Sequence, residues 1–430
     1  MLFDYRTEPA IPDGWRIEPI ENLIIDIGDG GTPPRNDPSN FGGGIAWAVI
    51  EDIRKDITST KETLSERGVF SSNAKVWPIQ SVVVSTGATI GRVGVARVPL
   101  ATKQGITGII PNKEAVFADY LAAVLMMGTS VLERFSQGST FKEIRPPTLM
   151  KLRLRVPETV DEQSRIAVVL DTVDEAIAKT EAVIAKLRQV RAGLLHDLLS
   201  RGLDPNGQLR DPIAQPEQFK DSPLGRIPKA WTVETLESCC SHVIDCPHST
   251  PNYLTVGVLV ARTMHIRDGR YDEESSSRLA EEEFVERIAR LRPEPGDVIF
   301  TREAPVGEAF VIPPGMRICL GQRVMLLRPR ADKLTGGYLL AQVYSGAVRQ
   351  RIDSLTGGTT NPHLNVAEVR KFTVPLPKVD EQVSIAGRLS AHDVLMESEM
   401  AQLTKLKHLK SGLMNDLLTG RVRVPAEKGQ

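Results

Sequence analysis

The sequence predicts a mixed α+β fold in which two α/β domains are each followed by a long helix, the two helices pairing as an antiparallel coiled coil with pseudo-two-fold symmetry. The motif Asp-Glu-Gln opens a helical pattern at Asp161 and again at Asp380. Both stretches carry the apolar spacing of a coiled coil, and an Ile-Pro-x-x-Trp motif stands near the start of each domain, at Ile11 and Ile227. A repeat of about half the chain is too long for a solenoid and indicates a tandem duplication.

The two helices are predicted from an apolar seam whose positions alternate in steps of four and three residues. No proline interrupts either stretch, and Pro157 and Pro377 stand just ahead of them. At 1.5 Å per residue each helix is about 57 Å long. The predicted pairing residues are Ile166, Leu170, Ile177, Ile184, Leu187 and Leu194 in the first helix, and Ile385, Leu389, Met396, Leu403, Leu406 and Leu413 in the second.

A lone helix with this seam would expose a wide apolar stripe, and its own copy in the same chain offers the simplest partner. We therefore expect the helices to pair with each other, the alternatives being packing on the neighbouring domain or on another chain. Polar residues interrupt the seam at matching places, Thr180 with Glu399 and Arg191 with Lys410. Such positions typically set the register of a coiled coil.

These patterns divide the chain into six segments. They are an N-terminal domain at 1–158, a central repeat helix at 159–201, a Pro- and Gly-rich linker at 202–226, a C-terminal domain at 227–378, a second repeat helix at 379–420 and a tail at 421–430.

Each domain combines buried strands with short helices. Val82–Val84 and Ile106–Ile110 are predicted strands in the first domain, as are Val298–Phe300 and Val324–Leu327 in the second. The expected helices are Tyr120–Met127 and Tyr338–Tyr344.

Three loops recur in both domains and combine small hydroxylated residues, Gln or Asn, and Lys or Arg. They are Ser85–Gly91 with Thr301–Gly307, Lys103–Gly105 with Gly321–Arg323, and Gly138–Lys142 with Gly357–Asn361. Such side chains suit contacts to phosphates and to base edges. Turn chemistry alone would also explain Gly, Ser and Thr, but recurrence in both copies favours binding.

Composition and motifs restrict the classes of function. A formal charge of −1 argues against indiscriminate binding of polyanions but permits a local basic groove. No apolar run reaches the roughly 20 residues of a membrane span, and the first residues do not resemble a signal peptide, so a cytoplasmic protein is expected.

Catalytic and metal-binding motifs are not evident. Cys239, Cys240, His242, Cys246 and His248 fit no zinc template. The sequence also has no phosphate-binding loop of the Gly-x-x-x-x-Gly-Lys-Ser/Thr type. We expect a chain without an active site and without a metal.

The order of these features resembles the specificity (S) subunits of type I restriction-modification enzymes. The resemblance covers almost the whole chain. It rests on the two Asp-Glu-Gln motifs with their heptads, the endings Leu194–Leu199 and Leu413–Leu418, the Ile-Pro-x-x-Trp motifs, and the segments Gly30–Pro34, Asp245–Pro251 and Thr301–Gly307.

This resemblance implies a non-catalytic subunit in which two target recognition domains read the halves of a bipartite site on double-stranded DNA. The helices would set the spacing and dock two methylation subunits, and restriction subunits for translocation and cleavage would join. S-adenosylmethionine, ATP and Mg would belong to those partners, and no cofactor to this chain. The predicted DNA-facing residues are Lys103, Gln104, Thr140, Lys142, Arg302, Gln322, Arg323, Thr360 and Asn361.

Two other functions remain open at this point. One is a stand-alone DNA-binding or scaffold protein without enzyme partners, and the other is a nuclease or methyltransferase that acts alone.

Because Thr86–Ala88 and Arg302–Ala304 differ, contact roles do not transfer from one domain to the other.

Overall fold

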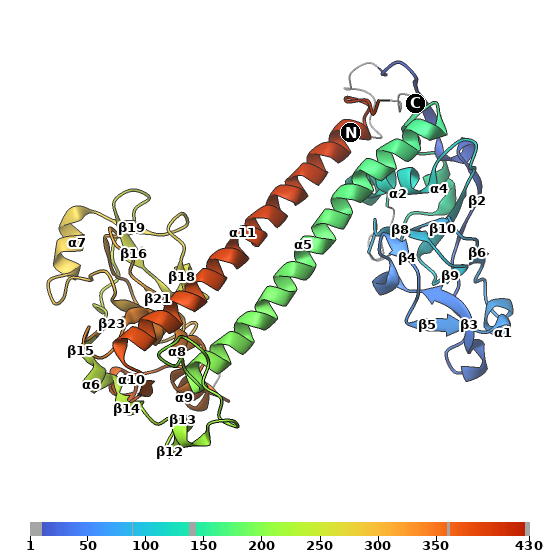
Figure 1. The fold of residues 1–430 in the computed structure, drawn as a ribbon. Helices are drawn as coiled ribbons and strands as arrows, with labels where there is room; N and C mark the ends of the chain where they lie inside the picture. Colours follow the sequence, from blue (N-terminus) through green and yellow to red (C-terminus); the bar gives the residue numbers. More distant parts are fainter. Residues whose placement is uncertain (1–10, 88, 137–142, 359–361, 426–430) are drawn as a thin grey trace. The chain divides into compact units, whose positions relative to one another are not determined.

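A computed structural model describes residues 11–87, 89–136, 143–358 and 362–425 (Figure 1). The chain forms two compact units. Unit 1 comprises Met1–Glu181 with Ala401–Gln430, and unit 2 comprises Ala182–Met400. Each unit therefore contains one α/β domain, the beginning of the long helix that follows it, and the end of the other long helix.

Unit 1 is built on a five-stranded sheet in the order β2-β10-β7-β8-β4 and a four-stranded sheet in the order β5-β3-β9-β6. Its strands are β1 (Trp15–Pro19), β2 (Ile24–Asp29), β3 (Phe41–Ala48), β4 (Asp56–Ile57), β5 (Glu62–Leu64), β6 (Val76–Trp77), β7 (Val82–Ser85), β8 (Val93–Ala96), β9 (Leu100–Thr102), β10 (Ile106–Pro111) and β11 (Arg153–Pro157). Its shorter helices are α1 (Glu66–Phe70), α2 (Ala118–Met127), α3 (Thr129–Phe135) and α4 (Pro146–Met150), with 3-10 turns η1 (Ile20–Asn22), η2 (Pro38–Asn40) and η3 (Ile50–Asp52).

Unit 2 has a four-stranded sheet in the order β15-β23-β20-β21 and a three-stranded sheet in the order β19-β16-β22. Its strands are β12 (Phe219–Ser222), β13 (Gly225–Pro228), β14 (Thr232–Thr235), β15 (Cys240–Asp245), β16 (Val258–Ala261), β17 (Ile266–Arg267), β18 (Arg270–Tyr271), β19 (Arg278–Leu279), β20 (Val298–Thr301), β21 (Ala309–Val311), β22 (Ile318–Leu320), β23 (Val324–Pro329) and β24 (Thr373–Leu376). Its shorter helices are α6 (Leu236–Cys239), α7 (Glu281–Arg287), α8 (Gly336–Tyr344), α9 (Ala347–Thr356) and α10 (Val366–Arg370), with 3-10 turns η4 (Pro216–Gln218) and η5 (Thr263–His265).

The two units share one topology. The antiparallel order β2-β10-β7-β8 corresponds to β15-β23-β20-β21. The parallel pair β3 and β9 corresponds to the parallel pair β16 and β22. The central strands β7 and β20 are buried throughout, and each is an apolar run that ends in one hydroxylated residue, as strands covered on both faces require. The predicted strands and short helices are confirmed, since they lie within β7, β10, β20, β23, α2 and α8.

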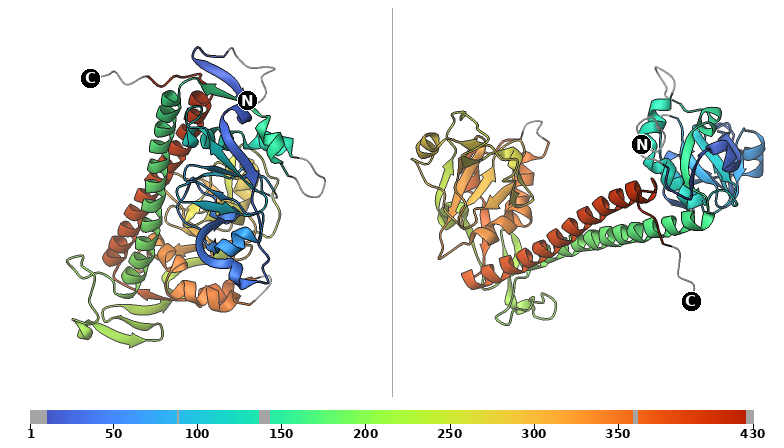
Figure 2. Two further views of the ribbon diagram at one scale, coloured as in Figure 1. Left: turned by 90° about the vertical axis from the view of Figure 1, so that its right-hand side faces the viewer. Right: turned by 90° about the horizontal axis from the view of Figure 1, so that it is seen from above.

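The repeat helices are α5 (Val160–Ser200) and α11 (Val379–Leu417). Within each unit they lie side by side and antiparallel (Figures 1 and 2). In unit 1, Lys410 on α11 is 2.6 Å from a carboxylate oxygen of Asp174 on α5. In unit 2, Arg191 on α5 donates to Asp393 on α11 at 3.0 Å. The predicted antiparallel pairing is therefore confirmed, and all of the predicted pairing residues are buried or half-buried.

The leucine-rich ending of each helix enters the core of the unit in which that helix ends. Leu198 and Leu199 of α5 pack with Trp231 in unit 2. Leu417 and Leu418, at the end of α11, pack with Trp15 in unit 1. The duplicated Ile-Pro-x-x-Trp and Leu-Leu motifs are thus two sides of one packing arrangement that occurs in each unit.

The glutamine of each Asp-Glu-Gln motif is fully buried and holds the start of its helix against the domain. The side-chain amide of Gln163 donates to Pro157 O at 3.1 Å, and its carbonyl accepts from Phe117 N at 2.8 Å. Gln382 donates to Pro377 O at 3.0 Å and accepts from Thr335 N at 2.9 Å. A buried amide that satisfies backbone groups on two elements fixes their relative position.

The segment predicted to be a linker is more ordered than its composition suggests. Residues 219–228 form a β-hairpin of β12 and β13. Upstream of it, Arg210 forms an ion pair with Glu381 at the start of α11, with 2.6 Å between Nη1 and Oε1. These contacts attach the segment to the rest of unit 2.

Among the residues that the structure describes, no helix combines the length and apolar character that crossing a bilayer requires.

Candidate nucleic-acid interface

In unit 1 the recurring loops meet at one end of the central sheet. The amides of Thr86 and Gly87, after β7, donate to the carbonyl oxygen of Gly105 at 2.9 and 3.0 Å. The amide of Ile144 donates to Thr86 O at 2.9 Å. Ile144 follows the third recurring loop, Gly138–Lys142, which lies outside the described residues. Two of the three loops, and the segment leading out of the third, are therefore joined by backbone hydrogen bonds.

Unit 2 repeats this arrangement with different side chains. Arg302 N donates to Arg323 O at 2.9 Å, and Leu364 N donates to Arg302 O at 3.1 Å. Arg302 thus takes the place of Thr86, Arg323 that of Gly105, and Leu364 that of Ile144. The framework of the loops is conserved within the chain, whereas the side chains that it presents are not.

The turn after the central strand is built in the same way in both units. Ser85 Oγ accepts from Arg92 N at 2.9 Å, and Thr301 Oγ1 accepts from Glu308 N at 2.9 Å. Gly91 and Gly307 close the turns with φ angles of +91° and +84°. Only glycine adopts that conformation without strain, which explains why a hydroxylated residue and a glycine recur six positions apart.

A carboxylate at the end of the first strand of each central sheet organises the loop cluster. In unit 1, Asp29 accepts from the amides of Gly30 and Gly105 at 3.0 and 3.2 Å. Burial raises the pKa of Asp29, and these two hydrogen bonds oppose the rise. In unit 2, Asp245 accepts from Cys246 N at 2.9 Å and forms an ion pair with Arg302 at 3.1 Å. Neither carboxylate is among the predicted DNA-facing residues, although Asp245 opens one of the segments that carry the family resemblance and Asp29 directly precedes another.

Five of the nine predicted DNA-facing residues lie in the described loop clusters. Lys103 and Gln104 are exposed beyond the end of β9. Gln322 is half-buried and donates to Thr250 Oγ1 at 2.7 Å. Arg323 is exposed, with its Nε 3.9 Å from Glu303.

Arg302 differs from the others, because its side chain is buried and paired with Asp245. Thr140, Lys142, Thr360 and Asn361 lie outside the described residues. DNA contact by any of the nine stays a prediction.

The chemistry available at these clusters is recognition by donors and acceptors. Within the described ranges, no three His, Cys, Asp or Glu side chains are arranged to hold a metal ion. Cys239, Cys240, Cys246 and Cys319 are free and buried. Burial raises the pKa of Cys240 to about 12, so this thiol stays protonated at neutral pH.

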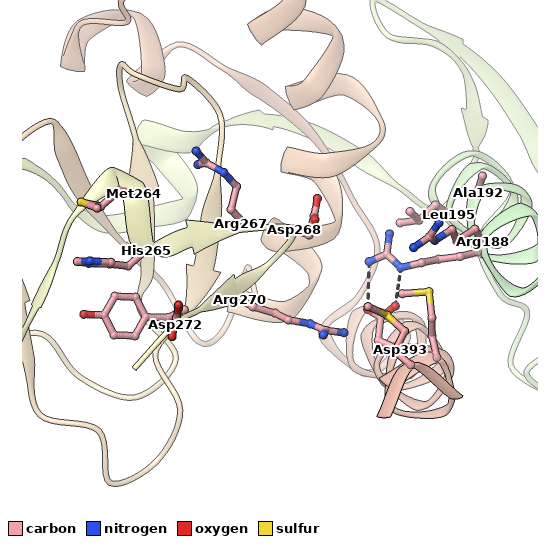
Figure 3. Close-up of a pocket in the computed structure, with 14 residues that line it drawn as sticks. Arg188, Ala192, Leu195, Met264, His265, Arg267, Asp268, Arg270, Asp272 and Asp393 are labelled. Atoms are coloured by element: carbon pink, nitrogen blue, oxygen red, sulfur yellow. Dashed lines mark hydrogen bonds and ion pairs between the residues drawn. The ribbon is translucent and has the colours of Figure 1, made fainter. Parts of the chain in front are cut away.

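A separate groove in unit 2 lies between the C-terminal domain and the helix pair (Figure 3). Its volume is about 690 Å³. Arg267 and Arg270, from the hairpin of β17 and β18, line it from the domain, and Arg191 and Asp393 line it from the helices. Arg270 extends from the hairpin toward the helices in the close-up.

Comparison with known proteins identifies the family of the chain. Residues 12–189 and 266–408 match the family described as type I restriction modification DNA specificity domain. The type I restriction enzyme MjaVIII specificity subunit of Methanocaldococcus jannaschii is 21% identical over 427 residues, covering 96% of this chain and 94% of that protein. The MjaIX specificity subunit of the same organism is 28% identical over 233 residues, covering 53% of this chain and 51% of that protein.

A crystal structure of a type I restriction-modification system S subunit from M. genitalium has the same fold. The two structures align with a TM-score of 0.60 and 14% sequence identity, covering 97% of this chain and 99% of that one. The matched residues cover nearly all of the N-terminal domain, the C-terminal domain from residue 266 onward, and most of both repeat helices. The chain therefore belongs to the family of type I restriction-modification DNA specificity subunits.

Proposed function

We propose that this chain is the non-catalytic subunit that gives a type I restriction-modification complex its DNA sequence specificity. Each domain reads one half of a bipartite site on double-stranded DNA. The paired helices hold the two readers at a set spacing and dock two methylation subunits. Restriction subunits join the complex, and S-adenosylmethionine, ATP and Mg are bound by the partners.

The observation that carries this proposal is the pair of equivalent loop clusters. The same backbone hydrogen bonds join the loops at Thr86 and Gly105 in unit 1 and at Arg302 and Arg323 in unit 2. Because the side chains at these positions differ, one framework presents two different sets of donors and acceptors. Two readers of different specificity on one chain match a bipartite, asymmetric site.

The length of the helices supports a role as spacer. Helix α5 has 41 residues, which corresponds to about 60 Å at 1.5 Å per residue. Readers on one face of a duplex bind half-sites about 34–36 Å apart, one helical turn, or a multiple of that distance. A continuous helix pair is stiff enough to keep such a spacing fixed.

Exposed apolar residues on the helices support docking of two identical partners. Val190 on α5 is 44% exposed, and Leu409, its counterpart in the repeat on α11, is 51% exposed. One lies in unit 2 and the other in unit 1. Related apolar positions in both repeats suit a subunit that binds once to each half of a pseudo-symmetric chain.

The proposal is tested by mapping methylated adenines across the host genome with and without this gene. We expect one asymmetric, bipartite motif to disappear with the gene. Replacing residues 1–157 by the corresponding part of a related subunit should then change one half of the motif. A change in both halves, or no dependence of methylation on the gene, would contradict the proposal.

Co-purification separates this function from that of a stand-alone DNA-binding protein. We expect tagged chain to retain a methylation subunit when both are expressed together. Replacing Val190 and Leu409 by Asp should release that subunit while both domains stay folded, since neither side chain is buried.

A further inference from the structure

Two ion pairs that are equivalent in the repeat connect the long helices. Asp174 and Asp393 occupy the same repeat position, as do Arg191 and Lys410. Asp174 pairs with Lys410 in unit 1, and Asp393 pairs with Arg191 in unit 2. The basic interruptions of the seam, Arg191 and Lys410, are therefore each matched with an acid of the opposite helix, as register-setting residues would be.

In unit 1 the same carboxylate also binds the N-terminal domain. The second oxygen of Asp174 is 2.8 Å from the ammonium of Lys55, which also contacts Asp171. Lys55 lies between η3 and β4, and its carbonyl accepts from Val95 N on β8 at 2.8 Å. A cation anchored on the central sheet thus reaches a carboxylate that pairs the helices, and only 33% of the Lys55 side chain and 21% of the Asp174 side chain are exposed.

Unit 2 lacks this shared carboxylate among its described contacts. Arg191 donates to both oxygens of Asp393. The C-terminal domain instead reaches α11 through Arg270, whose Nη2 is 2.7 Å from Glu397. Their side chains are 45% and 51% exposed, so water and salt screen this pair more strongly than the pair in unit 1.

We propose that Lys55 is a positioning residue that fixes the angle of the N-terminal domain on the helix pair and thereby restricts the spacer length that the protein accepts. The inference rests on the proposed function, because it concerns the distance between the two half-sites. Lys55 is suited to this role since its contacts join three elements, the central sheet, α5 and, through Asp174, α11. Among the described contacts, the ion pair of Arg270 joins its domain to α11 and not to α5, so it constrains the C-terminal domain less.

The test uses the full chain assembled with its methylation subunits and duplexes that carry the mapped site with its natural spacer or with spacers one base pair shorter or longer. In Lys55→Met, we expect methylation of the altered spacers, relative to the natural one, to rise roughly threefold, the size expected for loss of a partly buried ion pair. Lys55→Arg keeps the charge and should restore the original preference. Arg270→Met should change the ratio less than Lys55→Met does.

A control variant and the choice of readout separate positioning from other effects. Lys61 is an exposed lysine of the same domain, outside this network, and Lys61→Met controls for loss of one positive charge. The ratio of altered to natural spacers is the decisive readout, because a general loss of DNA affinity or of folded protein lowers all rates alike.

Each outcome decides a different point. If the unaltered complex ignores spacer length, the proposed function itself fails. If the unaltered complex prefers the natural spacer and the Lys55→Met complex prefers it equally, the role of Lys55 is refuted while the proposed function stands. The same conclusion follows if Lys61→Met weakens the preference for the natural spacer as much as Lys55→Met does. Equal relaxation by Lys55→Met and Arg270→Met would refute the difference between the two domains.

Discussion

Arg423 and Glu162 form a two-pronged ion pair across most of the sequence. Nε and Nη2 of Arg423 donate to the two carboxylate oxygens of Glu162 at 2.6 and 2.7 Å. Arg210 also binds both carboxylate oxygens of Glu381, donating from Nη1 and Nη2 at 2.6 and 3.1 Å. In each unit, the acid at the start of one long helix is thus bound by an arginine that follows the end of the other. The duplicated Asp-Glu-Gln motif supplies both a buried glutamine clamp and an acceptor for this arginine.

Loss of the Arg423 side chain should destabilise unit 1. Arg423→Met leaves the carboxylate of Glu162, which is only 7% exposed, without its cation. Because the arginine itself is partly exposed, water can replace some of the interaction, and we expect a loss of about 1–2 kcal/mol in the free energy of unfolding. Urea denaturation measures it. Arg421→Met removes an exposed pair with Asp416 and should cost less than about 0.5 kcal/mol; equal losses would show that the pair with Glu162 has no special role.

The glutamine clamps should contribute more than the ion pairs do. Gln382→Leu removes the side-chain donor to Pro377 O and the acceptor of Thr335 N, and leaves these buried backbone groups unsatisfied. We expect a loss of about 2–4 kcal/mol, measured as above. Gln163→Leu should have a similar effect in unit 1. Gln350→Leu, at an exposed position of α9, is the matched control, and a clamp variant as stable as this control would contradict the assignment.

The glycine after α5 should not tolerate a side chain. Gly202 has a φ of +63°, and a Cβ there would stand 2.4 Å from Trp231 and from Glu381. Gly202→Ala should therefore cost more than the roughly 1–2 kcal/mol of backbone strain that a left-handed conformation imposes on alanine. Gly225→Ala measures strain alone, because φ is +89° and nothing lies within 4 Å of its Cβ position. Similar losses of thermal stability in the two variants would rule out the steric contact.

Helix pairing in unit 1 should weaken in acid through Asp174. Burial would raise the pKa of Asp174, but hydrogen bonds from Lys410 and Lys55 outweigh it and hold the pKa below 3.8. A group whose pKa is lowered by folding stabilises the protein fully above its unfolded pKa, and this stabilisation is lost as the pH falls through the folded value. Unfolding measured from pH 6 down to pH 3 should show that Asp174→Asn is less stable than the unaltered chain at pH 6, with the difference shrinking below about pH 4. A difference that grows on acidification would have the wrong sign for this interaction.

The loop clusters should act on separate halves of the DNA site. Gln104 in unit 1 and Arg323 in unit 2 are both exposed loop residues whose side chains can donate hydrogen bonds. Gln104→Ala and Arg323→Ala each remove one such side chain. We expect each change to lower affinity roughly tenfold and to relax the base preference in one half of the site only, the cost of about one base contact. Binding to duplexes with one altered half-site measures it. Loss of preference in both halves from one substitution would contradict independent reading.

The sequence was sufficient for the helices and their antiparallel pairing because these follow from local periodicity and from a repeat. The arginines that bind the acids at the helix starts could not be predicted in this way. Arg423 and Arg210 do not stand at the same repeat offset as Glu162 and Glu381, so neither spacing nor symmetry indicates that they meet. Contacts of this sort depend on how the chain returns after a long helix, which no local pattern encodes.

The predicted DNA-binding site also has a part that the sequence reveals and a part that depends on the tertiary fold. The recurring loops could be found from the sequence because turn residues and their recurrence are visible there, and backbone hydrogen bonds join the first two of them in each unit. The burial of Arg302, one of the predicted DNA-facing residues, against Asp245 could not be read from the sequence. An arginine in a loop gives no sign of whether a distant acid will neutralise it, and Asp245 reaches Arg302 only once β15 has paired with β23 and β23 with β20.

The exchange of helix ends between the two units has a consequence for synthesis on the ribosome. Leu417 and Leu418 complete the core around Trp15, and Arg423 binds Glu162. The first domain to be translated is therefore the last to be finished, because its missing residues emerge only after the second domain has been made. Until then its unfilled apolar surface is open to other nascent chains and to chaperones, and a premature stop near codon 410 would leave it incomplete at the opposite end of the sequence from the lesion.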